Sequence, residues 1–364
     1  MDGRAVVAGN ICLDITPMIP GSGFTEIGQL LKPGMLLQVG GVDLHTGGAV
    51  ANTGLAMKFF GAQVELMGKI GDDGFGSLVL KKLEEYGAET GMIVVPGAAT
   101  SYTIVLAPSG IDRIFLHDPG ASDTFTSGDI RWDMLSGVTL FHFGYPTVMK
   151  KMYEDEGKEL CEIFTRVKSM GIATSLDMAG VDPDSDAGHA DWNIILKKLM
   201  KDVDFFLPSV EELKFMLDRE VIRPAQNGIS VEDDVKPLAD RLLLMGAKVI
   251  MIKCGAAGIY YRTASASALS GLADQLGLDL KDWADKEGFE RSFKAEKVVS
   301  ATGAGDTSIA AFLAAVMDHR PLSECLKFAT AAGASCVEAY DALSGLMSFS
   351  AMEEKMRGGW QKNG

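Results

Sequence analysis

Short apolar runs alternate with amphipathic stretches along most of the chain. Six of these runs predict buried strands, at residues 5–9, 64–67, 138–143, 172–176, 203–207 and 249–252. Helical periods at 48–60, 75–86, 156–170 and 239–245 are each followed by a glycine, the residue that most easily ends a helix in the left-handed conformation. Strands alternating with helices predict a mostly parallel sheet covered on both faces, with ligand sites at the carboxyl ends of its strands.

Three segments depart from this rhythm. Residues 11–46 are rich in Gly and Pro, and residues 97–126 contain two strand-like runs, 102–106 and 113–117, around Pro108-Ser109-Gly110. We expect a small β-rich flap from these two segments, with long surface loops as the alternative. Residues 263–295 begin with small side chains and continue with a charged stretch; we interpret them as a surface insertion.

The composition narrows the possible partners. The 364 residues are 47% hydrophobic and carry a net charge of −15, which argues against nucleic acid as a partner because phosphate backbones attract clustered Lys and Arg. No apolar run has the length of a membrane helix and the start lacks a signal-peptide pattern, so we expect a cytoplasmic protein without a membrane partner. The five cysteines form no Cys-x-x-Cys pair, and we expect Cys254, Cys325 and Cys336 to be core residues.

The run Thr302-Gly303-Ala304-Gly305-Asp306-Thr307 precedes a helical pattern at 308–318. Small residues at a helix N-terminus leave backbone N–H groups free to bind an anion. Asp306 is then either a helix-capping residue or a base beside a phosphate site, taking a proton from a hydroxyl that attacks a γ-phosphate. P-loop and Gly-x-Ser-x-Gly motifs are missing from the sequence.

A second glycine-rich start lies at Gly47-Gly48, four residues before Asn52. The glycine pair permits close approach of a ligand, and Asn52 falls one helical turn further on. An amide at that place can donate and accept hydrogen bonds with sugar hydroxyls. The alternative is an ordinary surface Asn on the helix.

Together these stretches resemble the ribokinase-like (pfkB) carbohydrate kinases. The resemblance also includes residues 9–14, 68–76, 252–258, 299–312 and 328–337. It implies an α/β fold, a ribokinase-like three-layer α/β/α sandwich with a mostly parallel central sheet and a small β-rich lid. Residues 1–364 would form one kinase domain, with the lid at approximately 12–46 and 97–122.

The resemblance also implies roles for individual residues. Asp306 would be the general base, with an anion hole formed by Gly303, Ala304, Gly305 and Asp306 itself. The sugar would be bound by Asp14, Gly47, Gly48 and Asn52. ATP would be bound by Ser209, Lys253, Gly255, Gly258 and Thr330, with Mg²⁺ at Glu212.

Two positions differ from the family pattern. Ser209 stands where the family often has Asn, so a phosphate contact there is less expected. Ser300 stands where many members have an Asp beside a monovalent-cation site, and we therefore expect little dependence on potassium.

The sequence thus predicts an ATP- and Mg²⁺-dependent kinase acting on a sugar hydroxyl, dimerising through its lid. A nucleoside kinase is an alternative, because Tyr102, Phe115 or Phe143 would suit a base-stacking shelf. A non-catalytic sugar-binding protein is another alternative. A phosphosugar substrate would need Lys32, Lys58 or Arg113 near the sugar.

Overall fold

The structure is a computed structural model that describes residues 3–19, 26–108, 113–222 and 228–364. Within them, a nine-stranded sheet has the order β13-β12-β11-β10-β9-β8-β1-β4-β5. All its neighbours pair in parallel except β11 with β12 and β12 with β13. Its strands are β1 (Arg4–Gly9), β4 (Gln63–Gly71), β5 (Met92–Val95), β8 (Val138–Gly144), β9 (Ala173–Asp177), β10 (Phe205–Phe206), β11 (Val249–Lys253), β12 (Gly258–Thr263) and β13 (Glu287–Arg291).

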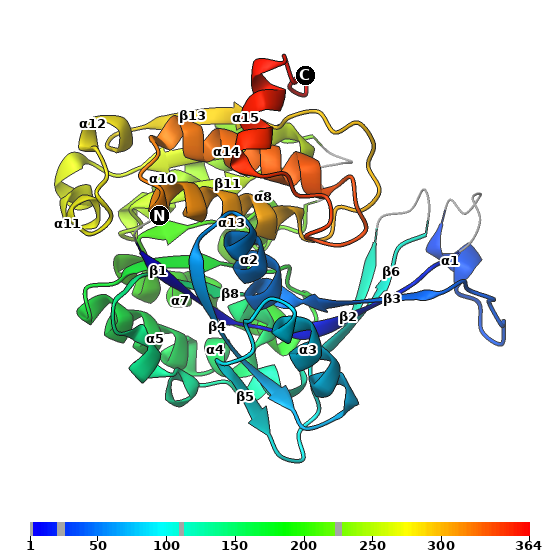
Figure 1. The fold of residues 1–364 in the computed structure, drawn as a ribbon. Coiled ribbons are helices and arrows are strands. Elements are labelled where there is room, and N and C mark those ends of the chain that lie inside the picture. Colours follow the sequence, from blue (N-terminus) through cyan, green and yellow to red (C-terminus); the bar gives the residue numbers. More distant parts are fainter. Residues whose placement is uncertain (1–2, 20–25, 109–112, 223–227) are drawn as a thin grey trace.

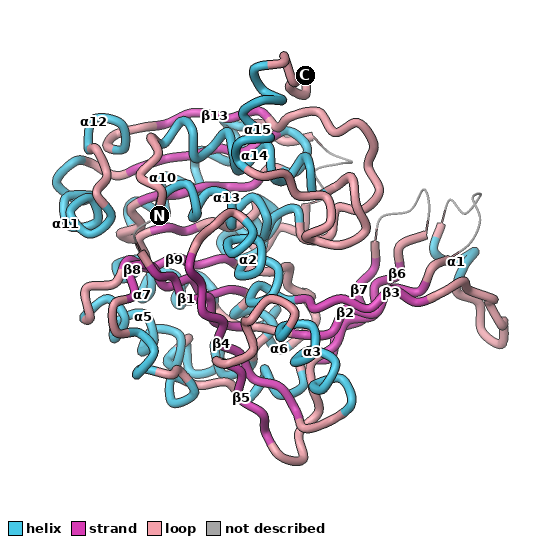
Figure 2. The backbone as a smooth tube through the Cα atoms, viewed as in Figure 1, coloured by secondary structure: helices cyan, strands magenta, loops and turns pink. Residues whose placement is uncertain are grey.

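Alternate residues of the central strands pack against two different helical layers, because successive side chains of a strand point to opposite faces. In β1, Ala5 and Val7 belong to one apolar cluster and Val6 and Ala8 to the other. Figures 1 and 2 show helices on both faces. The first cluster includes residues of α2 (Gly48–Phe59), α3 (Gly74–Glu84), α11 (Ala266–Leu276), α12 (Leu280–Trp283), α13 (Ala304–Met317), α14 (Leu322–Cys336) and α15 (Phe349–Arg357).

The second cluster contains the helices of the opposite face. They are α4 (Lys150–Tyr153), α5 (Lys158–Ser169), α7 (Trp192–Leu199), α8 (Val210–Leu213) and α10 (Lys236–Leu244), and α6 (Asp186–His189) lies beside α4. This arrangement confirms the predicted three-layer fold. No helix in the described part of the chain has the length and apolar character needed to cross a membrane.

A separate four-stranded sheet projects from the body (Figure 1). It has the order β3-β2-β6-β7 and consists of β2 (Cys12–Pro17), β3 (Val42–Gly47), β6 (Tyr102–Leu106) and β7 (Ile114–Asp118). The short helix α1 (Ile27–Leu30) lies between β2 and β3. The expected hairpin is present as β6 and β7, while its turn at 109–112 lies outside the described residues. We call this sheet the lid.

Our interpretation of 263–295 as a surface insertion is wrong. The segment supplies α11 and α12 and the edge strand β13, which pairs with β12. Trp283 is buried, and its ring packs edge-on against Phe205 of the sheet and Phe312 of α13. Charged residues alternate with the apolar ones in this segment, so its contribution to the core was not apparent from the sequence.

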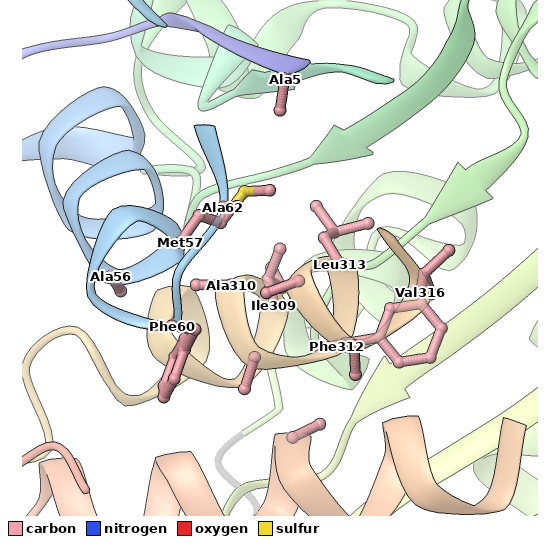
Figure 3. Close-up of a cluster of buried hydrophobic side chains, with 14 of the residues drawn as sticks. Ala5, Ala56, Met57, Phe60, Ala62, Ile309, Ala310, Phe312, Leu313 and Val316 are labelled. Carbon is pink, nitrogen blue, oxygen red and sulfur yellow. The ribbon is translucent and has the colours of Figure 1, made fainter. Parts of the chain in front are cut away.

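The helices α2 and α13 lie side by side under the sheet, and Figure 3 shows their shared apolar cluster. Met57 of α2 and Ile309, Phe312 and Leu313 of α13 are fully buried there. Cys254, Cys325 and Cys336 are buried free cysteines, which confirms their prediction as core residues. Because α2 and α13 are packed against each other along their length, the polar residues at their N-termini are held close together.

Candidate active site

The site lies where α2 and α13 begin, beside the carboxyl end of β8. The residue before α13, Gly303, has φ 76° in the left-handed region, and a Cβ there would lie 2.4 Å from the Cβ of Ala342. The backbone therefore requires glycine at this turn. The helix begins at Ala304, earlier than the expected residue 308, so Asp306 lies in its first turn.

Asp306 is buried, with 3% of its surface exposed, and its carboxylate accepts hydrogen bonds from three side chains. Asn52 Nδ2 donates to Oδ2 at 3.1 Å, Thr53 Oγ1 donates to Oδ1 at 3.3 Å, and the Tyr145 hydroxyl lies 2.8 Å from both oxygens. The helix-capping alternative is wrong, because Gly303 is the N-cap residue of α13 and the Asp306 carboxylate is bonded to side chains outside this helix. In this structure the oxygens of Asp306 are covered by these donors.

Burial raises the pKa of Asp306, while the Tyr145 hydrogen bond, the Lys253 charge and the bonds from Asn52 and Thr53 oppose the rise. The net pKa is above the ordinary aspartate value. A carboxylate with a raised pKa accepts a proton more readily than an exposed one, as a general base requires.

Asn52 is not the surface residue of the alternative interpretation. It is 7% exposed, lies in the first half of α2, and is bonded to Asp306 although the two residues are 254 positions apart. The structure thus brings together two of the predicted site residues in direct contact.

Tyr145 is a site residue that the sequence analysis missed. It follows β8 directly and precedes Pro146, with φ 67° and ψ 43° in the left-handed region. This conformation is costly for a bulky residue. The signal was a polar aromatic residue at the carboxyl end of a predicted buried strand, where α/β sheets place ligand sites.

Asp14 lies in β2 of the lid, close enough to Asp306 for the two carboxylates to repel each other. A Cβ on Gly47 would lie 2.3 Å from the Asp14 carboxyl group, so a larger residue at position 47 would displace this side chain. The Cys12 Sγ lies 3.3 Å from Asp14 Oδ1. Burial raises the pKa of Asp14 to about 6, helped by the Asp306 charge and opposed by Cys12 and Thr103.

A largely buried ion pair lies next to the turn before α13. Lys253 Nζ is 2.6 Å from Asp177 Oδ1, and the Lys253 side chain is 3.6–3.7 Å from where a Cβ on Gly305 would be. Burial opposes the charge on Lys253, but Asp177, Glu212 and Asp306 hold its pKa above the ordinary value. A cation therefore stands beside the predicted anion hole.

Arg113 of the lid also reaches this turn, because its Nη1 donates to Thr302 Oγ1 at 3.0 Å. Of the three basic residues considered for a phosphosugar, Arg113 is the one that contacts this turn in the described part of the chain. Lys58 donates to the carbonyl of Gly87, and Lys32 is exposed.

The aromatic residues considered for a nucleoside shelf have different surroundings. Phe143 is fully buried among Phe125, Phe141 and Phe164, so its proposed shelf role is wrong. Tyr102 packs edge-on against Phe75, and Phe115 is 51% exposed.

The residues predicted to bind the nucleotide lie just after β10 and β11 and in the middle of α14. Ser209 pairs with Lys253 through an isolated bridge and caps α8, whose Glu212 Oε2 accepts a hydrogen bond from the Ser209 N–H at 2.6 Å. Gly255 and Gly258 flank the turn after β11, and Thr330 is buried in α14. Among the described residues, the side chains of Ser209, Lys253 and Thr330 make no hydrogen bond to Asp306.

The side chains around this site suit a magnesium ion that is held mainly by the phosphates of the nucleotide. In the ranges that the structure describes, no group of three His, Cys, Asp or Glu side chains is arranged to hold a metal ion. Mg²⁺ usually binds one or two carboxylates together with substrate phosphates and water. Glu212 is a carboxylate near the turn after β10, and its Oε2 accepts a hydrogen bond from the Ser209 N–H.

The fold and the site define a ribokinase-like kinase scaffold. A ribokinase from Arabidopsis thaliana complexed with ribose and ATP has a TM-score of 0.71 and 19% identity, covering 97% of this chain and 98% of that one. A putative ribokinase II from E. coli in complex with ATP and Mg²⁺ has a TM-score of 0.71 and 20% identity, covering 98% and 99%. Fructokinase-1 of Zea mays is 24% identical over 347 residues, 91% of each sequence.

The family follows from the sequence match. Residues 8–347 match the pfkB family carbohydrate kinases, and the chain belongs to this family. The protein is therefore a carbohydrate kinase, as the sequence predicted.

Proposed function

We propose that the protein transfers the γ-phosphoryl group of ATP to a hydroxyl group of a small sugar, with Asp306 as the general base. The observation that carries this proposal is the position of the Asp306 carboxylate. It lies in the first turn of α13, directly after the glycine-rich turn, and is hydrogen bonded to Asn52 of α2. One group thus borders both a candidate phosphate site and a candidate sugar site.

In the proposed reaction, the sugar oxygen forms a bond to the γ-phosphorus and the bond to the ADP oxygen breaks. The hydroxyl proton passes to Asp306. We propose that the N–H groups of Gly303 and Gly305 and the Lys253 ammonium face the charge on the transferred group, while the Ala304 N–H donates to the Ala301 carbonyl at 3.4 Å. Such preorganised donors stabilise the transition state without reorganisation during the reaction.

On the sugar side, Asp14 and Asn52 offer hydrogen bonds, and Gly47 and Gly48 let the Asp14 carboxyl group and Asn10 lie close to the start of α2. Relatives named as fructokinases and ribokinases make D-fructose and D-ribose the first candidates. We propose that Arg113 joins the phosphate site from the lid, since its contact with Thr302 connects the lid to the turn before α13.

On the nucleotide side, we propose that Ser209, Lys253, Gly255, Gly258 and Thr330 line the ATP site and that Glu212 holds Mg²⁺ together with the phosphates. The bound metal would neutralise charge on the triphosphate. The bridge between Ser209 and Lys253 supports this placement, because it brings a capping residue of α8 next to the cation beside Gly305.

We also propose that two copies associate through their lids. Val42, Phe115 and Leu116 are each at least 50% exposed on the lid strands, and exposed apolar groups of this kind are typical of an interface between copies. Light scattering should give twice the mass of one chain, and Phe115→Glu should return the mass to one chain. A wild-type monomer at all concentrations would refute the dimer.

The function is tested by ADP release in a coupled assay with MgATP. D-fructose and D-ribose should each be tried beside adenosine. We expect ADP release that depends on a sugar and yields the sugar phosphate. Turnover with adenosine alone would favour the nucleoside alternative. Sugar binding by calorimetry without any turnover would favour the non-catalytic alternative and contradict the proposal.

A further inference from the structure

The carboxylate of Asp306 has no free position for another donor in this structure. Oδ1 receives Thr53 and Tyr145, and Oδ2 receives Asn52 and Tyr145. A carboxylate offers about four lone-pair positions, so the four contacts use its capacity. A sugar hydroxyl that donates its proton to Asp306 must first displace one of them.

The three donors differ in how easily they can give way. Asn52 and Thr53 are buried on α2, whose N-terminal half is buried throughout. Tyr145 follows the end of a strand, and as a whole residue it keeps more exposed surface than Asn52 or Thr53. Its single proton is shared between two oxygens, each 2.8 Å away. A shift toward one oxygen keeps a hydrogen bond and frees the other oxygen.

The backbone of Tyr145 is held in place while its hydroxyl remains a donor. Pro146 follows it, and the Tyr145 N–H donates to the Asp177 carbonyl at 3.3 Å. Burial and the charges of Asp306 and Asp177 raise the pKa of the phenol well above its usual value. A phenol that stays protonated competes with an incoming hydroxyl and does not act as a base itself.

We propose that Tyr145 is a positioning residue that covers both oxygens of Asp306 in the sugar-free enzyme and yields one of them to the acceptor hydroxyl. This inference rests on the proposed role of Asp306 as the base. While Tyr145 covers the carboxylate, water cannot take the place of the sugar. Asp306 is therefore not available to take a proton from a water molecule that would attack ATP.

The reaction that Tyr145 suppresses is ATP hydrolysis. In it, the water oxygen forms a bond to the γ-phosphorus, the bond to the ADP oxygen breaks, and a proton of the water passes to Asp306. In the Tyr145→Phe variant, one hydroxyl is missing and the ring remains, so a water can donate to Asp306 in its place.

The test measures phosphate release from MgATP alone, without any sugar. We expect Tyr145→Phe to raise the rate roughly tenfold, because a hydrogen bond to a charged group is worth on the order of 1.4 kcal/mol or more. Tyr145→Asn should raise the rate too; Asn tolerates the left-handed conformation and is too short to replace the hydroxyl. Tyr153→Phe is the control, a half-buried tyrosine that packs on Trp192 away from the site.

The double variant Tyr145→Phe with Asp306→Asn should return to the wild-type background rate. A hydrolysis rate of Tyr145→Phe and Tyr145→Asn equal to or below that of the wild type would overturn the inference. Failure of the proposed function is a separate result, seen when Asp306→Asn alone retains sugar phosphorylation. If Tyr145 only packed against its neighbours, its replacement would lower the activity. A higher rate of ATP hydrolysis is expected only if the Tyr145 hydroxyl blocks the Asp306 carboxylate.

Discussion

Two carboxylates in this protein have opposite surroundings. Asp306 lies in the first turn of α13 and already accepts hydrogen bonds from Asn52, Thr53 and Tyr145. Asp14 lies on the lid strand β2, next to a weak thiol donor, and burial raises its pKa to about 6. Neighbouring acids in different environments can take different roles. The comparison shows that the donors around Asp306 already use its hydrogen-bonding capacity, whereas Asp14, beside Cys12 and Thr103, can accept a further hydrogen bond from a ligand.

The largest effect on turnover should come from replacing Asp306. Replacing Asp306 by Asn keeps its shape and removes the base, so we expect the turnover number to fall by about 10²–10⁴-fold. The coupled assay at saturating sugar measures it. Asp318→Asn, at the other end of α13, is the matched control and should retain turnover. A near wild-type rate for Asp306→Asn would remove the distinction between the two carboxylates.

The second largest effect should come from Lys253, the cation next to the turn before α13. Lys253→Met should lower turnover by about 10²–10³-fold, since a charge facing the transferred group is lost. It should also lower the free energy of unfolding by about 3–5 kcal/mol, because Asp177 is left buried without its partner. Enzyme assays and urea unfolding measure the two effects.

The double variant Asp177→Asn with Lys253→Met separates these causes. It should regain much of the lost stability, because no uncompensated charge remains, but turnover should stay low. Recovery of turnover as well would mean that Lys253 only neutralises Asp177.

Asp14 should affect binding more than turnover. Asp14→Asn should raise the KM for the sugar roughly 10- to 100-fold, the value of a hydrogen bond to a charged group. In the wild type, lowering the pH through about 6 protonates Asp14 and should raise the same KM. The variant should lack this rise. A pH-dependent KM that persists in Asp14→Asn would assign the titration to another group.

The smallest effect should come from the lid arginine. Arg113→Ala removes the contact with Thr302 and should raise the KM for ATP by roughly three- to tenfold, as is typical of a partly exposed charge. The effect should shrink at high salt, because exposed charges are screened. Arg131→Ala, which loses only the exposed pair with Asp133, should change nothing. Equal effects of the two variants would show that Arg113 has no specific role.

Local sequence features predicted much of the fold, because glycines that end helices and short apolar runs act within a few residues. The glycine-rich turn before α13 was predictable for the same reason, since Gly303 is required by its own backbone. The expected strand at 203–207 is shorter, with only Phe205–Phe206 paired as a strand.

The parts that the sequence did not predict depend on distant partners. Tyr145 and Asp306 are 161 residues apart, and Lys253 and Asp177 are 76 apart, so no local pattern connects them. The same reason explains the error at 263–295. The burial of Trp283 depends on Phe205 and Phe312, which are brought together only by the folded sheet and helices.

The most direct measurement is a crystal structure with a sugar substrate and a non-hydrolysable ATP analogue. We predict that the reacting hydroxyl lies within about 2.6–3.2 Å of an Asp306 oxygen, on the side facing the γ-phosphate. A sugar bound with its reacting hydroxyl beyond hydrogen-bond reach of Asp306, and beside a different base, would contradict the central claim.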